Sequence, residues 1–135
     1  RQAQALAARD PRFRWSGALP HGLARCAIRD AHVLVHPSIM EGGANVIVEA
    51  ITAGTPVVAS RVSGNIGMLG RDYPGYFEAG DAHGLASLLA RLAADPEALR
   101  GLRRACEARR PLFTPARERY ALRRLVLGLL GARRR

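Results

Sequence analysis

The sequence predicts an α/β domain in which a parallel sheet is covered by helices. Short apolar segments at residues 33–36 and 57–59 alternate with stretches of helical periodicity, an order typical of βαβ units. Both segments are apolar at successive positions, as expected for strands that are buried on both faces. From residue 81 onward, leucines recur at helical spacing, which predicts a helical C-terminal part.

The first half of the chain alternates between helical and extended patterns. Pro11 closes the first helix, because proline excludes the helical turn that precedes it. Pro37 stops the second strand, and Gly54 is expected to cap the following helix in the left-handed conformation, with Pro56 just beyond. The predicted elements are a helix at 2–8, a strand at 13–15, a helix at 20–28, a strand at 32–36, a loop at 39–43 and a helix at 45–53.

The second half begins with one more buried strand and then turns helical. Asp95 is expected to cap a helix whose first residue is Pro96. Pro111 and Pro115 break that helix. The predicted elements are a strand at 57–59, a glycine-rich loop at 64–76, a strand at 76–78, a helix from 81 to 94, a helix from 96 and a last helix at about 116–130.

This order predicts a Rossmann-like parallel sheet flanked by helices, with a helical C-terminal tail. About four short strands are visible, whereas a complete doubly wound sheet has about five or six. We therefore expect the first one or two strands to lie upstream of Arg1. We divide the chain into a partial domain at residues 1–110 and a basic amphipathic helix at 111–135.

The charge of the chain is concentrated in the tail. The formal net charge is +10, all 21 basic residues are arginine, and mean hydropathy is −0.06. Residues 1–99 carry nine arginines and nine acidic residues, whereas residues 100–135 carry twelve arginines and two acidic residues. The tail is therefore expected to be a solvated or docking helix, and no nucleic acid partner is expected.

The lack of a recognisable targeting signal and the spacing of the two cysteines favour a cytoplasmic protein. The longest apolar run is about eight residues, whereas a membrane span needs about 20, so no transmembrane segment is expected. No charged and then apolar leader opens the chain. Cys26 and Cys106 lie far apart and form no CxxC motif, which favours two inert thiols in a reducing compartment.

The segment from residue 37 to residue 50 carries the best evidence for a ligand site. It follows the strand at 32–36, and ligands of open α/β sheets bind beyond the carboxyl ends of the strands. Gly42 and Gly43 let the backbone approach a ligand without a Cβ atom in the way. The N–H groups of residues 42–45 open a helix, whose dipole favours an anion such as a pyrophosphate.

Two carboxylates of this segment are candidates for sugar recognition. Glu49 shares a helical face with Asn45 and projects back toward the start of the helix. A carboxylate there accepts hydrogen bonds from a ribose diol beside the phosphates. Glu41 precedes the helix and is placed to meet hydroxyls of the group on the far phosphate. Spacing alone leaves open a plainer interpretation, in which Glu41 caps the helix and Glu49 is a surface residue.

The histidines do not predict a metal site. His32 and His36 lie four residues apart on a strand, about 13 Å, which is too far for one metal ion. His36 directly precedes the 37–43 loop and is placed to line the pocket. His21 and His83 lie at helix starts, where we expect caps rather than catalytic acids.

The glycines of the 64–76 loop give a weaker signal. Gly64, Gly67 and Gly70 recur every third residue but do not form GxGxxG, so a nicotinamide site is not supported. The loop follows the strand at 57–59 on the same sheet edge as residues 37–43. It is placed to line the donor pocket, although a plain surface turn explains any single glycine equally well.

Glu41 and Glu49, with seven residues between them, lie within PSIMEGGANVIVEAITAGTPVVAS. This pattern resembles the Glu-x7-Glu signature of the family 4 glycosyltransferases, which have the GT-B fold. The resemblance extends from the strand near Trp15 to the helix near Ala105. It implies that the chain is the nucleotide-sugar-binding C-terminal half of such an enzyme.

The resemblance also implies roles for individual residues. Glu49 matches the glutamate that holds the ribose, and Glu41 matches the one that approaches the donor sugar, which makes it the candidate catalytic residue. The backbone amides that follow Glu41 match those that approach the pyrophosphate. The residues expected to bind the donor are Ser38, Gly42, Gly43, Ala44, Asn45, Glu49, Gly64 and Asn65.

No metal or other cofactor is implied, because the family stabilises the leaving diphosphate with positive groups and helix amides. Members usually carry a basic residue for this purpose near the start of the domain. We expect that residue upstream of Arg1, with Arg61 and Arg71 as weak substitutes within the chain.

Three runs refine the resemblance, namely EGGANV at 41–46, GNIGMLG at 64–70 and DYPGYF at 72–77. Generic family members more often have Gly-Gly-Ile-Pro-Glu after the strand. The runs look like those of the selenosugar synthases of selenoneine biosynthesis, which join a UDP-N-acetylhexosamine to selenophosphate.

The expected function is therefore that of the donor-binding half of a glycosyltransferase, with a UDP-N-acetylhexosamine as donor and selenophosphate as a candidate acceptor. The acceptor would bind an N-terminal domain outside the chain, so the isolated chain is expected to be inactive. Two alternatives stay open. One is a nucleotide-binding or regulatory module without transfer activity, and the other, less favoured, is a nucleic-acid binder that uses the basic tail.

The apolar residues of the last helix make a separate prediction. Such a helix is too apolar to be exposed on a monomer without consequence. We expect it to pack partly on this domain and partly toward the N-terminal half, and to make the isolated chain self-associate. The residues concerned are Tyr120, Leu122, Leu125, Val126, Leu129 and Leu130.

Overall fold

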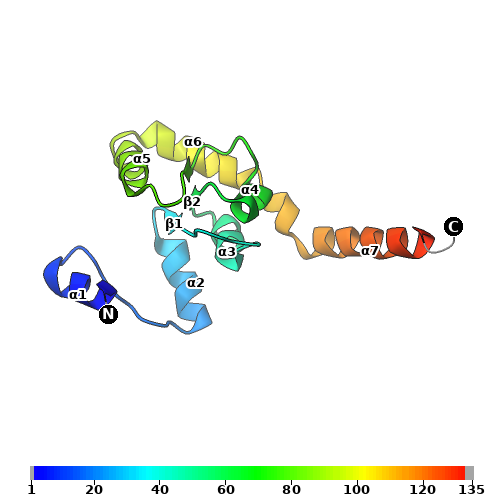
Figure 1. Ribbon diagram of the computed structural model, residues 1–135, viewed down its shortest axis with the longest axis horizontal. Coiled ribbons are helices and arrows are strands. Elements are labelled where there is room, and N and C mark those ends of the chain that lie inside the picture. Colours follow the sequence, from blue (N-terminus) through cyan, green and yellow to red (C-terminus); the bar gives the residue numbers. More distant parts are fainter. Residues whose placement is uncertain (1, 133–135) are drawn as a thin grey trace.

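The computed structural model describes residues 2–132, and its centre is a three-stranded parallel sheet in the order β1-β2-β3 (Figure 1). The strands are β1 (Leu34–His36), β2 (Val57–Ser60) and β3 (Tyr76–Phe77). The register pairs Leu34 with Val57 and Ala59 with Tyr76. Parallel strands need crossover connections, and a helix supplies each of them here. This arrangement confirms the predicted α/β class.

Helices surround the sheet and extend beyond it. They are α1 (Gln2–Arg9), α2 (His21–Asp30), α3 (Asn45–Ala53), α4 (Ser63–Leu69), α5 (Ala82–Ala94), α6 (Pro96–Glu107) and α7 (Pro115–Ala132), with a short 3-10 helix η1 (Arg110–Phe113) before α7. In Figure 1, α2 and α3 lie on one side of the strands and α5 and α6 on the other. Helix α1 lies apart at the end of an extended segment, and α7 projects in the opposite direction.

The core is built around β2, the central strand, all four residues of which are buried. Ile47 and Ile51 of α3 are fully buried, and Leu102 and Cys106 of α6 complete this part of the core. Continuous apolar character in β2 therefore reflects cover on both faces of the sheet.

A buried phenol–thiol pair joins β2 to α6. The Tyr73 hydroxyl donates to the Val57 carbonyl and lies 2.9 Å from the Cys106 sulfur. The Val57 N–H in turn lies 3.4 Å from the same sulfur. Burial raises the pKa of the Tyr73 hydroxyl, with a further contribution from Cys106, and burial also raises the pKa of the Cys106 thiol. Both groups are therefore neutral near neutral pH.

The helix boundaries confirm the caps predicted at Gly54 and Asp95 and add a further cap at Asp81. Gly54 ends α3 with φ 81° and ψ 15°, the left-handed conformation that glycine adopts without strain. Asp81 accepts a hydrogen bond of 2.8 Å from the Gly84 N–H, and Asp95 accepts one of 2.9 Å from the Glu97 N–H. These two carboxylates satisfy backbone donors at the starts of α5 and α6.

The predicted strand at residues 13–15 is wrong. Residues 13–20 have no regular structure, and Phe13 and Trp15 are 37% and 54% exposed. Local alternation favours an extended chain, but a strand needs a partner for its backbone hydrogen bonds. The described sheet consequently has three strands rather than about four.

The predicted loop at residues 64–76 is also wrong in its first half, where α4 forms. Leu69 of this helix is buried and Met68 packs against the core, so apolar contacts override the low helix propensity of the glycines. Gly70, with φ 95°, ends the helix. The glycines therefore do not indicate a loop here. Gly64 lies within α4, and Gly70 ends it.

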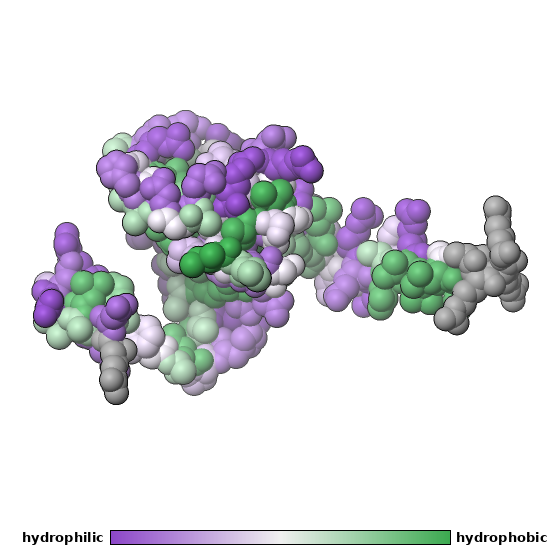
Figure 2. Space-filling view, in the orientation of Figure 1, coloured by the Kyte–Doolittle hydropathy of each residue, from purple (hydrophilic) through white to green (hydrophobic). Residues whose placement is uncertain are grey.

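The last helix forms as predicted, but most of it stands clear of the body (Figures 1 and 2). Its first turns face α3, and Ala121 and Val48 line the same shallow pocket of about 500 Å³. The apolar residues expected to be covered are 45–62% exposed, namely Tyr120, Leu122, Leu125, Val126, Leu129 and Leu130. Within residues 2–132, no helix is long and apolar enough to span a membrane.

Candidate functional site

The candidate site is built at the carboxyl end of the sheet, where β1 passes through the 37–44 loop into α3. The loop is exposed at its tip, where Ile39 and Met40 are 80% and 88% exposed. Its two ends are fixed, because His36 belongs to the sheet and Ala44 is buried in the core. The loop therefore has an exposed apolar tip and two fixed ends, with Ser38 and Glu41 half-buried on either side of the tip.

Glu41 is held inside this loop by one hydrogen bond and lies close to the side chain of His36. The Ser38 hydroxyl donates to Glu41 Oε2 at 3.0 Å and lies 2.8 Å from the Met40 carbonyl oxygen. His36 Nε2 lies 3.4 Å from the same carboxylate oxygen. Both contacts reach Oε2, and within residues 2–132 no hydrogen bond or ion pair is found at Oε1.

A buried network supports the loop from behind. The Ser60 hydroxyl, at the end of β2, donates to the Ser38 carbonyl. Asn65 is fully buried and donates from Nδ2 to the Ser60 carbonyl at 2.9 Å. The side chain of Asn65 therefore fixes the loop through Ser60 and Ser38 and lies behind the surface that a ligand would contact.

Gly64, in the first turn of α4, closes the other side of the loop. A Cβ atom at this position would collide with the backbone carbonyl of Glu41 and lie 3.1 Å from the carbonyl carbon of Gly42. Only glycine allows α4 to approach the loop this closely. Gly64, which the sequence predicts as a donor-binding residue, contacts the backbone of the loop in the structure, and its role in donor binding stays a prediction.

The amides at the start of α3 are only partly available. Gly42 and Gly43 are exposed, whereas the Ala44 N–H points at the Met68 thioether, with 3.2 Å between nitrogen and sulfur. A thioether is a weak acceptor, which a phosphate oxygen would readily replace. Asn45, the first residue of α3, is exposed, and α3 has no side-chain cap.

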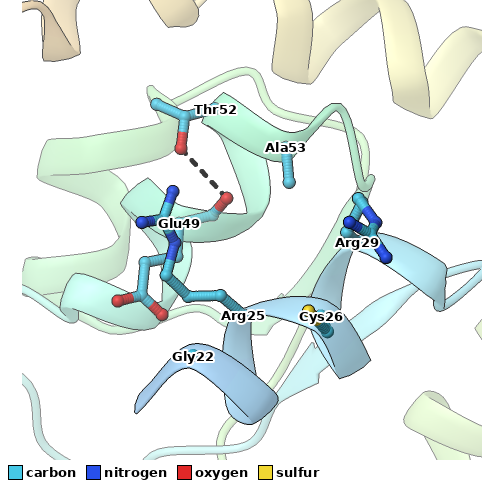
Figure 3. Close-up of a pocket in the computed structure, with 7 residues that line it drawn as sticks. All are labelled: Gly22, Arg25, Cys26, Arg29, Glu49, Thr52 and Ala53. Atoms are coloured by element: carbon cyan, nitrogen blue, oxygen red, sulfur yellow. Dashed lines mark hydrogen bonds between the residues drawn. The ribbon is translucent and has the colours of Figure 1, made fainter.

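Glu49 lies on α3 and faces α2. Its Oε1 lies 2.8 Å from Nε2 of His21, the first residue of α2. Glu49 also lines a pocket of about 380 Å³ between the two helices, together with Gly22, Arg25, Cys26, Arg29, Thr52 and Ala53 (Figure 3). In Figure 3 the Arg25 side chain extends from α2 toward α3, on the same side of the pocket as Glu49.

Three residues of this region, His21, Ser60 and Met68, escaped the sequence prediction of the site, and the contact of His36 with Glu41 was not predicted. His36 was expected only to line a pocket and His21 only to cap a helix, yet each lies beside one of the two glutamates. A signal was present, because the end of β1 and the start of α2 meet at the same edge of a parallel sheet. Ser60 and Met68 gave no comparable signal in the sequence.

The structure also places Arg61 and Arg71, the arginines considered as phosphate-binding substitutes, and His32, one of the two histidines of the predicted strand. Arg61 stacks on the Tyr76 ring, 5.3 Å from its centre, and lies 3.4 Å from the Arg71 carbonyl oxygen. His32 is exposed, and the part of the chain described here contains no cluster of three or more His, Cys, Asp or Glu residues that could hold a metal ion.

Comparison with known proteins identifies the family of the chain. The family described as "Glycosyl transferases group 1" matches residues 2–109, which include the sheet, the 37–44 loop and both glutamates. No curated protein matches the chain significantly. The match extends over most of the chain and covers every residue of the candidate site. The chain therefore belongs to the group 1 glycosyltransferases, as part of the C-terminal half of a GT-B fold.

Proposed function

We propose that this chain forms the nucleotide-sugar site of a glycosyltransferase that transfers a sugar from a UDP-sugar. The observation that carries the proposal is the placement of Glu41 and Glu49 on either side of the start of α3, within the family match. Residues 1–110 form the donor domain in this proposal, and residues 111–135 form a separate basic helix.

In the proposed complex, the diphosphate lies over the start of α3. The amides of Gly42, Gly43 and Ala44 donate to its oxygens, and the helix dipole favours its negative charge. When the phosphate binds, one of its oxygens replaces the Met68 sulfur as the acceptor of the Ala44 N–H, because a charged oxygen is the stronger acceptor. Asn45 lies at the same helix start.

The two glutamates recognise the two sugars in this proposal. Glu49 accepts hydrogen bonds from the ribose diol, and its contact with His21 is exchanged for those bonds. Glu41 directs Oε1 toward the hydroxyls of the transferred sugar, while Ser38 holds Oε2 and His36 lies 3.4 Å from it. The contacts at Oε2 support this division of the carboxylate between protein and donor.

The donor and acceptor are a finer part of the proposal. The runs at 41–46, 64–70 and 72–77 favour a UDP-N-acetylhexosamine as donor and selenophosphate as acceptor. The acceptor site belongs to a second domain, so the isolated chain is inactive in this proposal. The reaction needs no metal ion, because the amides and basic groups carry the charge of the leaving diphosphate. The two free cysteines support a reducing, cytoplasmic setting.

Calorimetric titration tests the proposal. We expect UDP and UDP-N-acetylglucosamine to bind the chain, ADP to bind less tightly, and a chelating agent to leave all three affinities unchanged. A wild-type chain that is folded by circular dichroism but binds no uridine nucleotide would contradict the donor-site assignment.

A transfer assay separates an enzyme from a binding module. We expect sugar transfer to selenophosphate by a protein in which this chain is joined to an acceptor domain, and none by the chain alone. Binding without transfer in the joined protein would favour the regulatory alternative. If the joined protein transfers sugar to other acceptors but not to selenophosphate, the glycosyltransferase activity is supported and selenophosphate is rejected as the acceptor.

A further inference from the structure

Within residues 2–132, His36 is the one residue beside Glu41 and Glu49 that belongs to the sheet, since Ser38 lies in the loop and His21 lies on α2. His36 is the last residue of β1 and pairs in register with Ala59 of β2. Its side chain is 19% exposed, whereas that of His21 is 73% exposed. The backbone of His36 is therefore fixed by strand pairing, and its imidazole is largely buried.

The ring nitrogen of His36 is incompletely satisfied. Nε2 is buried and has no hydrogen-bond partner within residues 2–132, although it lies 3.4 Å from Glu41 Oε2. A buried N–H without a partner is unfavourable, and the nearest acceptor is this carboxylate. A small movement of Glu41 within its loop is enough to complete the hydrogen bond.

The surroundings of Glu41 indicate what causes that movement. Oε2 is already held by Ser38 at 3.0 Å, and Gly64 prevents the loop backbone from moving toward α4. The exposed side of the loop, at Oε1, is where a ligand approaches. A sugar that donates to Oε1 would turn the carboxylate about its link to Ser38.

We propose that His36 is a positioning residue for Glu41, which donates from Nε2 to Oε2 when the donor sugar binds. The inference rests on the proposed function of Glu41. His36 itself does not contact the donor. It sets the direction of the carboxylate, so its effect is limited to ligands that carry the transferred sugar.

The test compares two ligands on three variants of the chain. His36→Phe keeps a flat ring and removes the donor atom, whereas His36→Gln places an amide N–H close to the position of Nε2. We expect His36→Phe to weaken UDP-N-acetylglucosamine by about threefold to tenfold, the range for one hydrogen bond, and to change UDP less than about twofold. His36→Gln should restore most of the lost affinity. His32→Phe, at an exposed position on the same segment, is the matched control and should change neither ligand.

A double-mutant cycle separates positioning from general support of the fold. In a Glu41→Ala chain, His36→Phe should cause no further loss of UDP-N-acetylglucosamine affinity, because its effect passes through the carboxylate. Equal losses for both ligands, or additive losses in the double variant, would overturn the inference. A wild-type chain that binds neither ligand would instead reject the proposed function, so the two failures are distinguishable.

Discussion

Glu41 and Glu49 have nearly the same exposure, 27% and 25%, but the protein supports them in different ways. Glu41 lies in a loop, where Ser38 holds it by a hydrogen bond, Ser60 supports Ser38, and the sheet residue His36 lies nearby. Glu49 lies on a regular helix and lines a pocket, and within residues 2–132 its carboxylate has one polar partner, the exposed His21.

The difference shows that the backbone around a carboxylate decides how many supporting contacts its side chain requires. A helix backbone already fixes the position of Glu49, so its side chain remains adjustable for a ligand. A loop fixes nothing by itself, so Glu41 depends on surrounding contacts. Substitutions near Glu41 should therefore affect recognition through geometry, whereas those near Glu49 should affect it only through direct contact.

The largest expected effect comes from removing Glu49. Glu49→Ala should weaken UDP by about tenfold to a hundredfold, because charge-assisted hydrogen bonds to the ribose contribute about 1.5–3 kcal/mol. Glu41→Ala should leave UDP nearly unchanged and weaken UDP-N-acetylglucosamine. Calorimetry with both ligands measures the contrast, and unchanged UDP affinity in Glu49→Ala would reject its ribose role.

The support of the Glu41 loop is tested by Gly64→Ala. The added Cβ collides with backbone that cannot easily move, so the free energy of unfolding should fall by about 1–3 kcal/mol. Sugar recognition should fall more than UDP binding. Gly67→Ala, in the same helix and with open space around it, should instead stabilise the chain by about 0.5–1 kcal/mol. Urea denaturation compares the two variants, and similar values for both would contradict the close approach of α4.

His21→Ala tests whether Glu49 needs its partner. Because an exposed ion pair contributes only about 0–1 kcal/mol, UDP affinity should change by less than about fivefold. A loss as large as that of Glu49→Ala would mean that His21 itself contacts the nucleotide. The measurement is the same calorimetric titration with UDP.

The smallest effect concerns Cys26, which lines the pocket beside Glu49. UDP should slow its alkylation roughly twofold, because a nucleotide held by Glu49 covers part of that pocket. Cys106 is the internal control, since burial raises the pKa of its thiol and keeps it protonated and inaccessible in the folded chain. Mass spectrometry of alkylated peptides measures both thiols, and an unprotected Cys26 at saturating UDP would place the nucleotide elsewhere.

The sequence was most informative where local and long-range signals agree. Helix α3 was predicted with its observed bounds, because Gly54 and Pro56 end it and because Ile47 and Ile51 follow the helical period. Helix α4 was missed because glycine has a low helix propensity, whereas the deciding contacts of Gly64 and Leu69 are with distant residues.

The candidate site shows the same limit. Its two glutamates stand out by their spacing, whereas His21 and Ser60 act through contacts with residues 28 and 22 positions away. Such contacts follow from the order of strands at one sheet edge and leave no periodic pattern. The exposed apolar surface of α7 likewise depends on what surrounds the helix, which the sequence of the helix does not encode.

Trp15 has a practical consequence for optical work on this chain. It is the chain's single tryptophan, and it lies half-exposed in the irregular segment that precedes α2. Tryptophan fluorescence therefore reports on the solvent around that segment and responds little when the sheet unfolds. Tyr73 is buried between β2 and α6, so its contribution to the summed absorbance of the three tyrosines changes when the core unfolds. The fluorescence and absorbance signals together distinguish fraying of the N-terminal segment from loss of the fold.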